Sequence, residues 1–544
     1  MPAEPDLVIR GAAVWKHPQA TALAIKAGRV VALGSDEDVL ARAAGSRTVV
    51  VDAGGATLLP GFQDAHAHPP MGGIDLMRCD VSSGRTVDDV RRIVREHVAS
   101  LPEGEWLLGS GWEFHIMGPD LDRAFLDEIA PGRPAYLVSG GRHDALVSSA
   151  ALSWAALHDG SPDPAHGRLG RRADGTLSGV LHEGAQIWFE SELPPPGQED
   201  YERAVLTAQQ HFHSLGITAW QDAWTTPATL DAYIALARSD RLTARVRAAL
   251  WWERDEGRDQ IDRFVEQRRA ADVGRLAAPA VKIMVDGTTG NQSAAVLEPY
   301  LDPGTGLECG CGNLFLPPHD LEAAVVELDA LGFGVHLHAI GERAVREALD
   351  AVESARAVNG PTPGRHHVAH VCLVHPDDIP RFAALDVAAN LQPLWAELNE
   401  ELLEENRWLG DERPGWWYPF ESLRAAGAPL CAGSDWPVSS ADPLLGAYVA
   451  VRRLAPGTTD PDREVLMPHE RMTVTDIVDA YTAGSARVNG LDGMTGAIGV
   501  GMLADLALLD RDLLTAEHDP ETLGRVRLTL VDGEAVHDPE GLAT

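Results

Sequence analysis

The middle of the chain alternates short apolar segments with longer helical stretches, such as residues 319–332 and 342–358. This alternation is typical of β/α units whose strands form a parallel sheet. Eight strands are predicted, at residues 56–66, 215–224, 245–252, 279–287, 333–340, 366–374, 386–393 and 428–437. Eight is the number that closes a parallel barrel, so the predicted class is α/β with a (β/α)8, TIM-like barrel.

The two ends of the chain carry β-hairpin patterns instead. Residues 20–34 alternate apolar side chains around a Lys-Ala-Gly turn, and residues 526–536 do so around Asp532 and Gly533. We therefore expect one small β-sandwich built from both ends, with the barrel inserted into it. The predicted boundaries are 1–58 and 485–544 for the two parts of the sandwich and 59–484 for the barrel domain.

One connection is far longer than a β/α loop needs. It follows the first barrel strand and covers about residues 70–200, with a strand-like segment at 134–140, a turn at 173–179 and three prolines at 194–196. We expect an inserted subdomain that lies over the mouth of the barrel.

Composition narrows the range of partners. The formal net charge of −36 disfavours nucleic acid, whose phosphates need a basic surface, and anionic membranes. The five cysteines are scattered and odd in number, unlike a disulfide framework. With no signal-peptide pattern and no long apolar run, we expect a cytoplasmic protein that acts on a small molecule, with a homodimer as the expected assembly.

Candidate metal ligands stand at the ends of the predicted strands. His66 and His68 lie two apart at the end of the first strand, so both face the same side. A histidine pair alone is more often structural than metal-binding. However, the carboxyl ends of all barrel strands meet at one mouth, and four further candidates follow that order: Lys282 in strand four, His338 in strand five, His370 in strand six and Asp435 after strand eight.

Each of these residues also has a structural interpretation. A single strand histidine is commonly a hydrogen-bonded core residue, and a buried Lys282 could instead pair with Asp286 or Asp435. The arrangement of all six in strand order favours a metal site. His336, two residues before His338, is interpreted as an interior neighbour rather than a ligand.

Several segments resemble the amidohydrolase superfamily. The segments LPGFQDAHAH, HLHAIGERAV and AGSDWP are similar to its barrel motifs. The segments VKIMVDGTTGNQSAAVLEPY and YTAGSARVNG, and the TGAIGVGMLADLALLD that follows, narrow the resemblance to the N-substituted formamide deformylase-like subgroup, amidohydrolase family 3. The resemblance spans nearly the whole chain. Two departures, Glu342 where Asp is usual and Ala369 where Glu is common, put ligand orientation and substrate choice in doubt.

The resemblance implies a divalent metal site, with zinc the expected ion. Its implied ligands are His66, His68, Lys282, His338, His370 and Asp435. Lys282 would be carboxylated by CO2 and bridge two ions, since a buried lysine readily loses its proton. Whether the site holds one ion or two stays open at this point.

The resemblance also implies a mechanism in which metal-activated water attacks an amide carbonyl. Asp435 takes the proton of that water and gives it to the leaving amine. His143, in the inserted segment, is the candidate contact for substrate or oxyanion. Trp112, Trp224 and Trp436 are the candidate substrate-binding residues. Trp224 and Trp436 lie near predicted strand ends and Trp112 lies in the inserted segment, and tryptophans at such places can line an apolar slot.

The predicted activity is hydrolysis of a non-peptide C–N bond, in a linear amide such as an N-substituted formamide. The alternative within the same superfamily is a cyclic amide or imide hydrolase, or a heterocycle deaminase. A different class, a catalytically silent barrel that acts as a binding protein, is disfavoured because the ligand set is complete.

Overall fold

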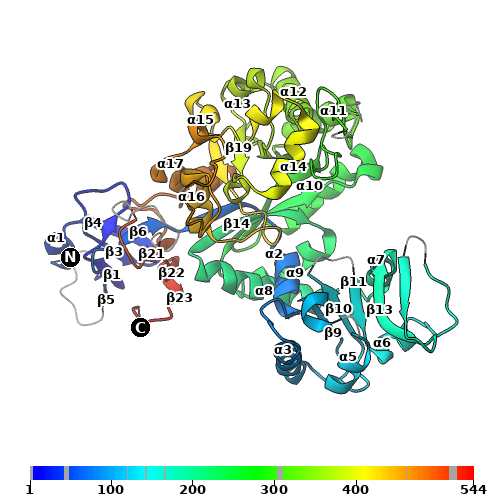
Figure 1. Ribbon diagram of the computed structural model, residues 1–544. Coiled ribbons are helices and arrows are strands. Elements are labelled where there is room, and N and C mark those ends of the chain that lie inside the picture. Colours follow the sequence, from blue (N-terminus) through cyan, green and yellow to red (C-terminus); the bar gives the residue numbers. More distant parts are fainter. Residues whose placement is uncertain are drawn as a thin grey trace. The chain divides into compact units, whose positions relative to one another are not determined.

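The computed structural model describes residues 4–41, 48–118, 121–140, 144–164, 167–302, 310–460, 462–513 and 524–543. The chain divides into two compact units (Figure 1). One unit contains residues 1–69 and 208–544, and the other contains residues 70–207. Each unit has its own sheets and is described separately below.

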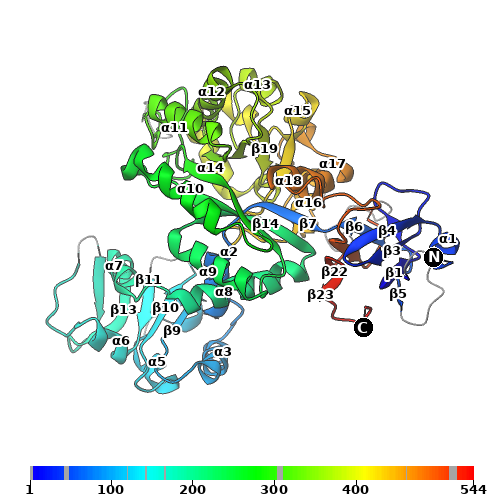
Figure 2. The same ribbon diagram turned by 180° about the vertical axis from the view of Figure 1, so that it is seen from behind.

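An eight-stranded parallel sheet forms the centre of the larger unit, with helices around it (Figure 2). The strands follow each other in chain order, which confirms the predicted (β/α)8 barrel. They are β7 (Phe62–Ala67), β14 (Ile217–Thr225), β15 (Arg245–Trp251), β16 (Leu276–Met284), β17 (Gly334–Ala339), β18 (His367–His370), β19 (Ala388–Leu391) and β20 (Leu430–Ala432).

Helices follow most of these strands, as a β/α barrel requires. Amphipathic segments such as 342–359 bury one face against the sheet and leave the other in water. The main helices are α8 (Gln198–Ser214), α9 (Pro227–Arg238), α10 (Ile261–Ala270), α11 (Pro318–Ala330), α12 (Glu342–Asn359), α13 (Ile379–Leu385), α14 (Glu400–Leu409), α15 (Phe420–Ala425), α16 (Pro443–Arg452), α17 (Val474–Asp479) and α18 (Ser485–Val488).

The barrel closes where the chain beyond β20 meets β7. The backbone N–H of Asp435 donates to the carbonyl of His66 at 2.7 Å, and that of His68 donates to the carbonyl of Trp436 at 2.8 Å. Gly433 allows this approach, because a Cβ there would lie 2.5 Å from the backbone nitrogen of His66. Closure therefore places the first and last strands, and their polar side chains, next to each other.

The first predicted strand, residues 56–66, is divided between two sheets. Its first half is β6 (Thr57–Pro60), which joins a terminal sheet, and its second half is β7. Gly61 lies between them, where a Cβ would meet the side chain of Thr218 at 2.3 Å. The absence of a side chain at Gly61 lets one continuous segment serve both sheets.

Both chain ends build the two small sheets of the larger unit, as predicted. One sheet, in the order β4-β3-β1-β5, contains N-terminal strands alone. In the other, β2-β6-β21-β22-β23, the N-terminal strand β6 pairs directly with the C-terminal strand β21. The remaining strands are β1 (Leu7–Arg10), β2 (Ala13–Val14), β3 (Ala22–Lys26), β4 (Arg29–Gly34), β5 (Val49–Asp52), β21 (Leu506–Leu509), β22 (Val526–Val531) and β23 (Glu534–His537), with helix α1 (Asp36–Leu40).

The smaller unit has a six-stranded mixed sheet of its own, in the order β12-β13-β11-β10-β9-β8. Its strands are β8 (Cys79–Asp80), β9 (Leu107–Trp112), β10 (Ala135–Ser139), β11 (Asp144–Val147), β12 (Gly167–Arg171) and β13 (Leu177–Glu183). Its helices are α2 (Pro69–Met77), α3 (Val87–Ser100), α4 (Phe114–Met117), α5 (Ala124–Ile129), α6 (Ser149–Trp154) and α7 (Gly184–Glu192). Across the described parts of both units, every helix is too short or too polar to span a bilayer.

Candidate metal centre

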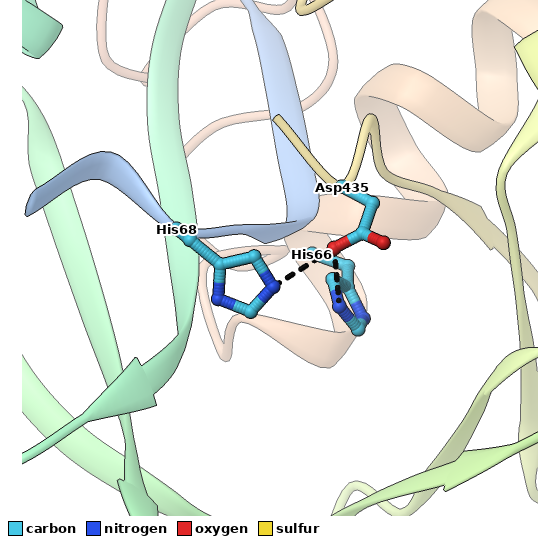
Figure 3. Close-up of side chains that lie close together, drawn as sticks. All are labelled: His66, His68 and Asp435. Atoms are coloured by element: carbon cyan, nitrogen blue, oxygen red, sulfur yellow. Dashed lines mark hydrogen bonds and ion pairs between the residues drawn. The ribbon is translucent and has the colours of Figure 1, made fainter. Parts of the chain in front are cut away.

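Three predicted ligands meet at the closure of the barrel (Figure 3). The Nε2 atoms of His66 and His68 lie 3.1 and 2.8 Å from the same oxygen, Oδ1 of Asp435. One possible ligand atom from each residue lies within 4.8 Å of the other two. Two imidazoles and a carboxylate at this spacing can bind one divalent metal ion.

Asp64 fixes the backbone on which two of these ligands stand. Its Oδ1 accepts hydrogen bonds from the backbone N–H of His66 at 3.0 Å and of Ser434 at 3.1 Å, and its Oδ2 accepts from the Ser434 hydroxyl. The carboxylate thus joins the strand of His66 to the turn that carries Asp435. Asp64 is not among the site residues predicted from the sequence, although its position two residues before His66, on the same strand face, was a usable signal.

Two of the predicted ligands have unusual backbone conformations. His370 has φ of 80° and Asp435 has φ of 57°, in the left-handed region that residues with a side chain rarely adopt. Such conformations persist only where surrounding contacts enforce them, and they concentrate at functional sites. At Asp435 the enforcing contact is the hydrogen bond from its backbone N–H to His66.

A second carboxylate orients His338. Asp286, after strand β16, accepts the Nδ1–H of His338 at 3.1 Å and also binds the backbone N–H groups of Ile340, Gly341 and Ala295 at 2.9–3.1 Å. With Nδ1 committed, Nε2 of His338 is the nitrogen available to a metal. From the sequence, Asp286 was predicted only as a possible partner of Lys282, and this role was missed.

His370 completes a continuous group of rings. Its ring centre lies 4.7 Å from that of His66 and 4.4 Å from that of His338. Its Nδ1 is buried and has no hydrogen-bond partner among the described residues, and the same holds for Nδ1 of His68. Leaving buried nitrogens unpaired is costly. The donor set fits a divalent cation, which would satisfy such an atom on His370.

Lys282 is fully buried in strand β16, beside His336 in the ladder to β17. No ion pair within 4 Å joins it to a carboxylate among the described residues, so the predicted alternative of a simple pair with Asp286 or Asp435 is absent there. Burial lowers the pKa of Lys282 to about 7, against the attraction of Asp435. A neutral amine is the form that reacts with CO2.

The charges around Asp435 also suit a metal. Burial works to raise the pKa of Asp435, but the adjacent His66 and His68 hold it well below its ordinary value. Burial lowers the pKa of His66 to about 3, and Lys282 acts in the same direction. The site therefore combines an ionised carboxylate with a neutral imidazole, which are the protonation states that metal ligation requires.

The predicted substrate contacts have different surroundings. Trp224 is 43% exposed, and its ring lies 6.3 Å from that of His68 and 5.5 Å from that of Trp251, so it borders the metal group. Trp436 is buried instead, with its ring 5.2 Å from those of Phe212 and His211.

Trp112 requires a correction. It is 1% exposed within the apolar core of the smaller unit, where its Nε1–H donates to the Leu137 carbonyl at 2.7 Å. Its ring is a packing element of that core and has no face for a substrate. His143 lies outside the described residues, so its proposed contact stays a prediction.

Comparison with known proteins extends these observations. The sequence profile of the amidohydrolase family matches residues 49–537. Protein LONG AFTER FAR-RED 3 of Arabidopsis thaliana is 28% identical over 550 residues, covering 98% of this chain and 91% of that protein. The N-substituted formamide deformylase of Arthrobacter pascens is 26% identical over 545 residues, covering 96% of each.

A solved structure has the same architecture. An uncharacterized metal-dependent hydrolase from Pyrococcus furiosus superposes with a TM-score of 0.72 at 25% identity, covering 94% of this chain and all of that one. The family match covers most of the chain, including His66, His68 and Asp435. The chain therefore belongs to the amidohydrolase family and is a metal-dependent hydrolase that acts on carbon–nitrogen bonds.

Proposed function

We propose that the protein hydrolyses a linear amide, such as an N-substituted formamide, at a zinc site that includes His66, His68 and Asp435. The observation that carries this proposal is the convergence of both imidazole Nε2 atoms on Oδ1 of Asp435 at the mouth of the barrel. Imidazole and carboxylate ligands suit zinc, although they accept other divalent ions. His338 in strand β17 and His370 in strand β18 extend the donor set.

A divalent metal bound here would polarise the amide carbonyl and lower the pKa of a water molecule toward about 7. Asp435 accepts a proton from the attacking water through Oδ2, the oxygen that neither histidine contacts. As the water oxygen bonds to the carbonyl carbon and the C–N bond breaks, Asp435 returns that proton to the amine nitrogen. The products are a carboxylic acid and a free amine.

Lys282 has the properties of a carboxylation site. Its neutral Nζ would bond to the carbon of CO2 and release one proton, which leaves an anionic carbamate able to bridge two cations. Complete burial and the lack of a carboxylate partner within the described residues support this assignment, because both favour the neutral amine.

An apolar surface beside the ligands supports a substrate with a bulky hydrophobic amine. Trp224 and Trp251 form a pair of rings next to His68, and Trp395 stacks on His370 with ring centres 5.2 Å apart and planes 2° from parallel. Flat rings of this kind bind aryl or alkyl groups better than sugars or phosphates. The resemblance to the Arthrobacter pascens deformylase over almost the whole chain supports a formyl group on the acid side.

A hydrolysis screen tests the proposal. The metal-loaded protein is offered formamides, acetamides and larger acyl amides of one arylalkyl amine, together with five- and six-membered cyclic amides and aminated heterocycles. Release of the amine and formate is measured with the loaded and the metal-stripped protein. We expect the formamide to give the highest kcat/KM and the stripped protein to be inactive.

Other results of the screen would favour one of the alternative substrate classes or contradict the proposed activity. Ring opening of a cyclic amide, or ammonia release from a heterocycle, without formamide hydrolysis would overturn the linear-amide proposal and keep the metal chemistry. Stoichiometric metal with no turnover on any class would contradict the proposed activity. A protein that retains no metal would remove the basis of the mechanism.

A further inference from the structure

We propose that a buried chain of hydrogen bonds fixes which ring nitrogen of His66 carries its proton, and so prepares the other nitrogen for the metal. The chain, called the relay below, consists of Asn390, His367, Gln221, His336 and His66. These are positioning residues for the metal site, apart from His66 itself. Of the proposed function, this inference assumes only that His66 is a metal ligand.

The five residues come from five barrel strands, and all are at most 1% exposed. Nδ2 of Asn390 lies 3.1 Å from Nδ1 of His367, and Nε2 of His367 lies 3.0 Å from Oε1 of Gln221. The same Oε1 lies 2.7 Å from Nδ1 of His336, and Nε2 of His336 lies 2.8 Å from Nδ1 of His66. Each separation is a normal hydrogen bond.

The direction of the relay is set at its Asn390 end. The Nδ2 atom of Asn390 lies 2.9 Å from the backbone carbonyl of Ala65, and a carbonyl can only accept. The group facing Ala65 must therefore be the amide nitrogen. The side chain of Gln392 donates to Oδ1 of Asn390 at 3.1 Å, which agrees with this orientation. The second N–H of Asn390 then points to His367 and donates to its Nδ1.

Each following bond is determined by the one before it. A neutral imidazole has one donor and one acceptor nitrogen, so His367 accepts at Nδ1 and donates from Nε2. Gln221 must therefore present its oxygen, which also accepts the Nδ1–H of His336. His336 is left with Nε2 as an acceptor, and the remaining proton of the pair belongs to Nδ1 of His66. The contacts of His336 and His367 among the described residues are to amides and imidazoles, with no carboxylate that would favour a cation.

The relay determines the state of Nε2, the ring nitrogen of His66 that faces the proposed metal position. With the proton on Nδ1, Nε2 presents its lone pair to the space beside Oδ1 of Asp435, 3.1 Å away. Neither atom then carries a proton, so a cation that binds both would take the place of a hydrogen bond between them. The opposite tautomer would direct an N–H at the metal position and would have to rearrange before a metal could bind. The Ala65 carbonyl, one residue before His66, thus controls His66 through four side chains.

The substitution Asn390→Asp reverses the relay without changing its shape. A carboxylate only accepts, so His367 would donate from Nδ1, Gln221 would turn its nitrogen toward both rings, and His336 would donate to His66. The proton of His66 would then lie on Nε2. We expect zinc affinity, measured by competition with a chelator, to fall about 10- to 100-fold, the usual range for residues that orient a metal ligand.

Asn489→Asp is the matched control. Asn489 is equally buried, and its Oδ1 accepts from Nε2 of Gln221 at 3.2 Å. A carboxylate there keeps that acceptor and loses the bond that Nδ2 donates to Oε1 of Gln63 at 3.2 Å, much as Asn390→Asp loses its bond to Ala65. It therefore adds the same charge to the same network without reversing the relay. We expect this variant to bind zinc about tenfold or more tightly than Asn390→Asp. Equal zinc affinity in the two folded variants would overturn the proposal.

A second pair of variants serves if Asn390→Asp does not fold. Gln221→Glu keeps an oxygen acceptor for His336 and His367, whereas Gln221→Met has nearly the same volume and no acceptor. We expect Gln221→Glu to retain most of the zinc affinity and Gln221→Met to lose it, with circular dichroism confirming the fold of each. A merely structural role predicts the reverse order, because Glu introduces a buried charge and Met does not.

These measurements use zinc alone and no substrate. If the wild-type protein binds zinc but hydrolyses no amide, the proposed activity fails while the relay can still be tested. If all relay variants bind zinc as the wild type does, the relay is wrong whatever the substrate is.

Discussion

The side chain of Asp435 contacts His66 at the end of β7 and His68 just beyond it, and the backbone of Asp435 is left-handed. We expect Asp435→Asn to lower kcat about 100- to 10,000-fold, because the amide cannot accept the proton of the attacking water. The rate of amine release measures this loss, and metal content measured in parallel separates it from loss of the ion.

Asp442→Asn provides the control for that substitution. Asp442 caps helix α16 through a hydrogen bond from the backbone N–H of Leu444, and asparagine caps helices equally well. We expect wild-type kcat in this variant. A similar loss of rate in both variants would show that the effect of Asp435→Asn is not specific to its position.

Lys282 allows a separate test of carboxylation. We expect Lys282→Ala to lose activity together with at least one equivalent of metal, since no carbamate can form. Acetate or propionate added to this variant should restore part of both, because a small carboxylate can occupy the space left by the side chain. Unchanged metal content by elemental analysis would contradict a bridging role.

The segment after strand β20 can approach strand β7 because residue 433 is a glycine. A methyl group at this position would lie 2.5 Å from the nitrogen and 2.7 Å from the Cβ of His66. We expect Gly433→Ala to reduce the free energy of unfolding by about 1–3 kcal/mol, as overpacking does, and to weaken zinc binding by displacing Asp435. Urea denaturation and chelator competition measure the two effects.

Gly415→Ala is the comparison for this element. A Cβ at Gly415 has no atom within 4 Å, and the residue does not adopt a positive φ. The substitution should leave zinc affinity unchanged and keep stability at or slightly above the wild-type value. Loss of zinc binding in Gly415→Ala, or its retention in Gly433→Ala, would contradict the closure argument.

The strands were predictable because each is a short apolar run bounded by turns, and every predicted segment overlaps a barrel strand. What periodicity could not show is which single polar residues connect the strands. Asp64 and Asp286 act largely through backbone N–H groups, which no motif of paired side chains marks, and only the place of Asp64 two residues before His66 hinted at its role. Trp112 was misassigned because its place in the inserted segment does not show whether its ring faces a substrate or packs in a core, and its own unit supplies that core.

In the whole chain, a buried ion network ties the barrel to the C-terminal sheet. Arg245 at the start of β15 donates to both oxygens of Asp505 at 2.6 and 3.1 Å and also pairs with Asp532, which Arg275 contacts at 2.7 Å. We expect Arg245→Met to cost about 3–5 kcal/mol of unfolding free energy, because it leaves the buried Asp505 without its partner.

An exposed pair serves as the reference for this effect. Arg487 also binds both oxygens of one carboxylate, that of Asp386, but in contact with water. Arg487→Met should change the unfolding free energy by about 1 kcal/mol or less. Equal losses in the two variants, measured by denaturant unfolding, would show that burial does not distinguish them.

The acid sensitivity of the fold should depend partly on His213, which joins α8 to the start of β14. Its Nδ1 lies 3.0 Å from the Ile217 carbonyl and its Nε2 lies 2.9 Å from the Thr243 hydroxyl. Burial lowers the pKa of His213 to about 4, against the hydrogen bond to Ile217, from an ordinary value near 6.5. Between these values the unfolded chain binds a proton that the folded chain does not, so the stabilising contribution is complete above about pH 6.5 and is lost as the pH falls toward 4.

The substitution His213→Gln removes this difference in proton binding between the folded and the unfolded chain. We expect the variant to be less stable than the wild type at pH 7.5 and to approach it as the pH falls from about 6.5 to 4, in urea titrations of the metal-free protein. His319→Gln, at an exposed ring, should follow the wild type throughout. A constant stability difference between His213→Gln and the wild type would mean that His213 contributes packing alone. Protonation of the His213 ring would then contribute nothing to the loss of stability in acid, although the ring still joins helix α8 to the barrel.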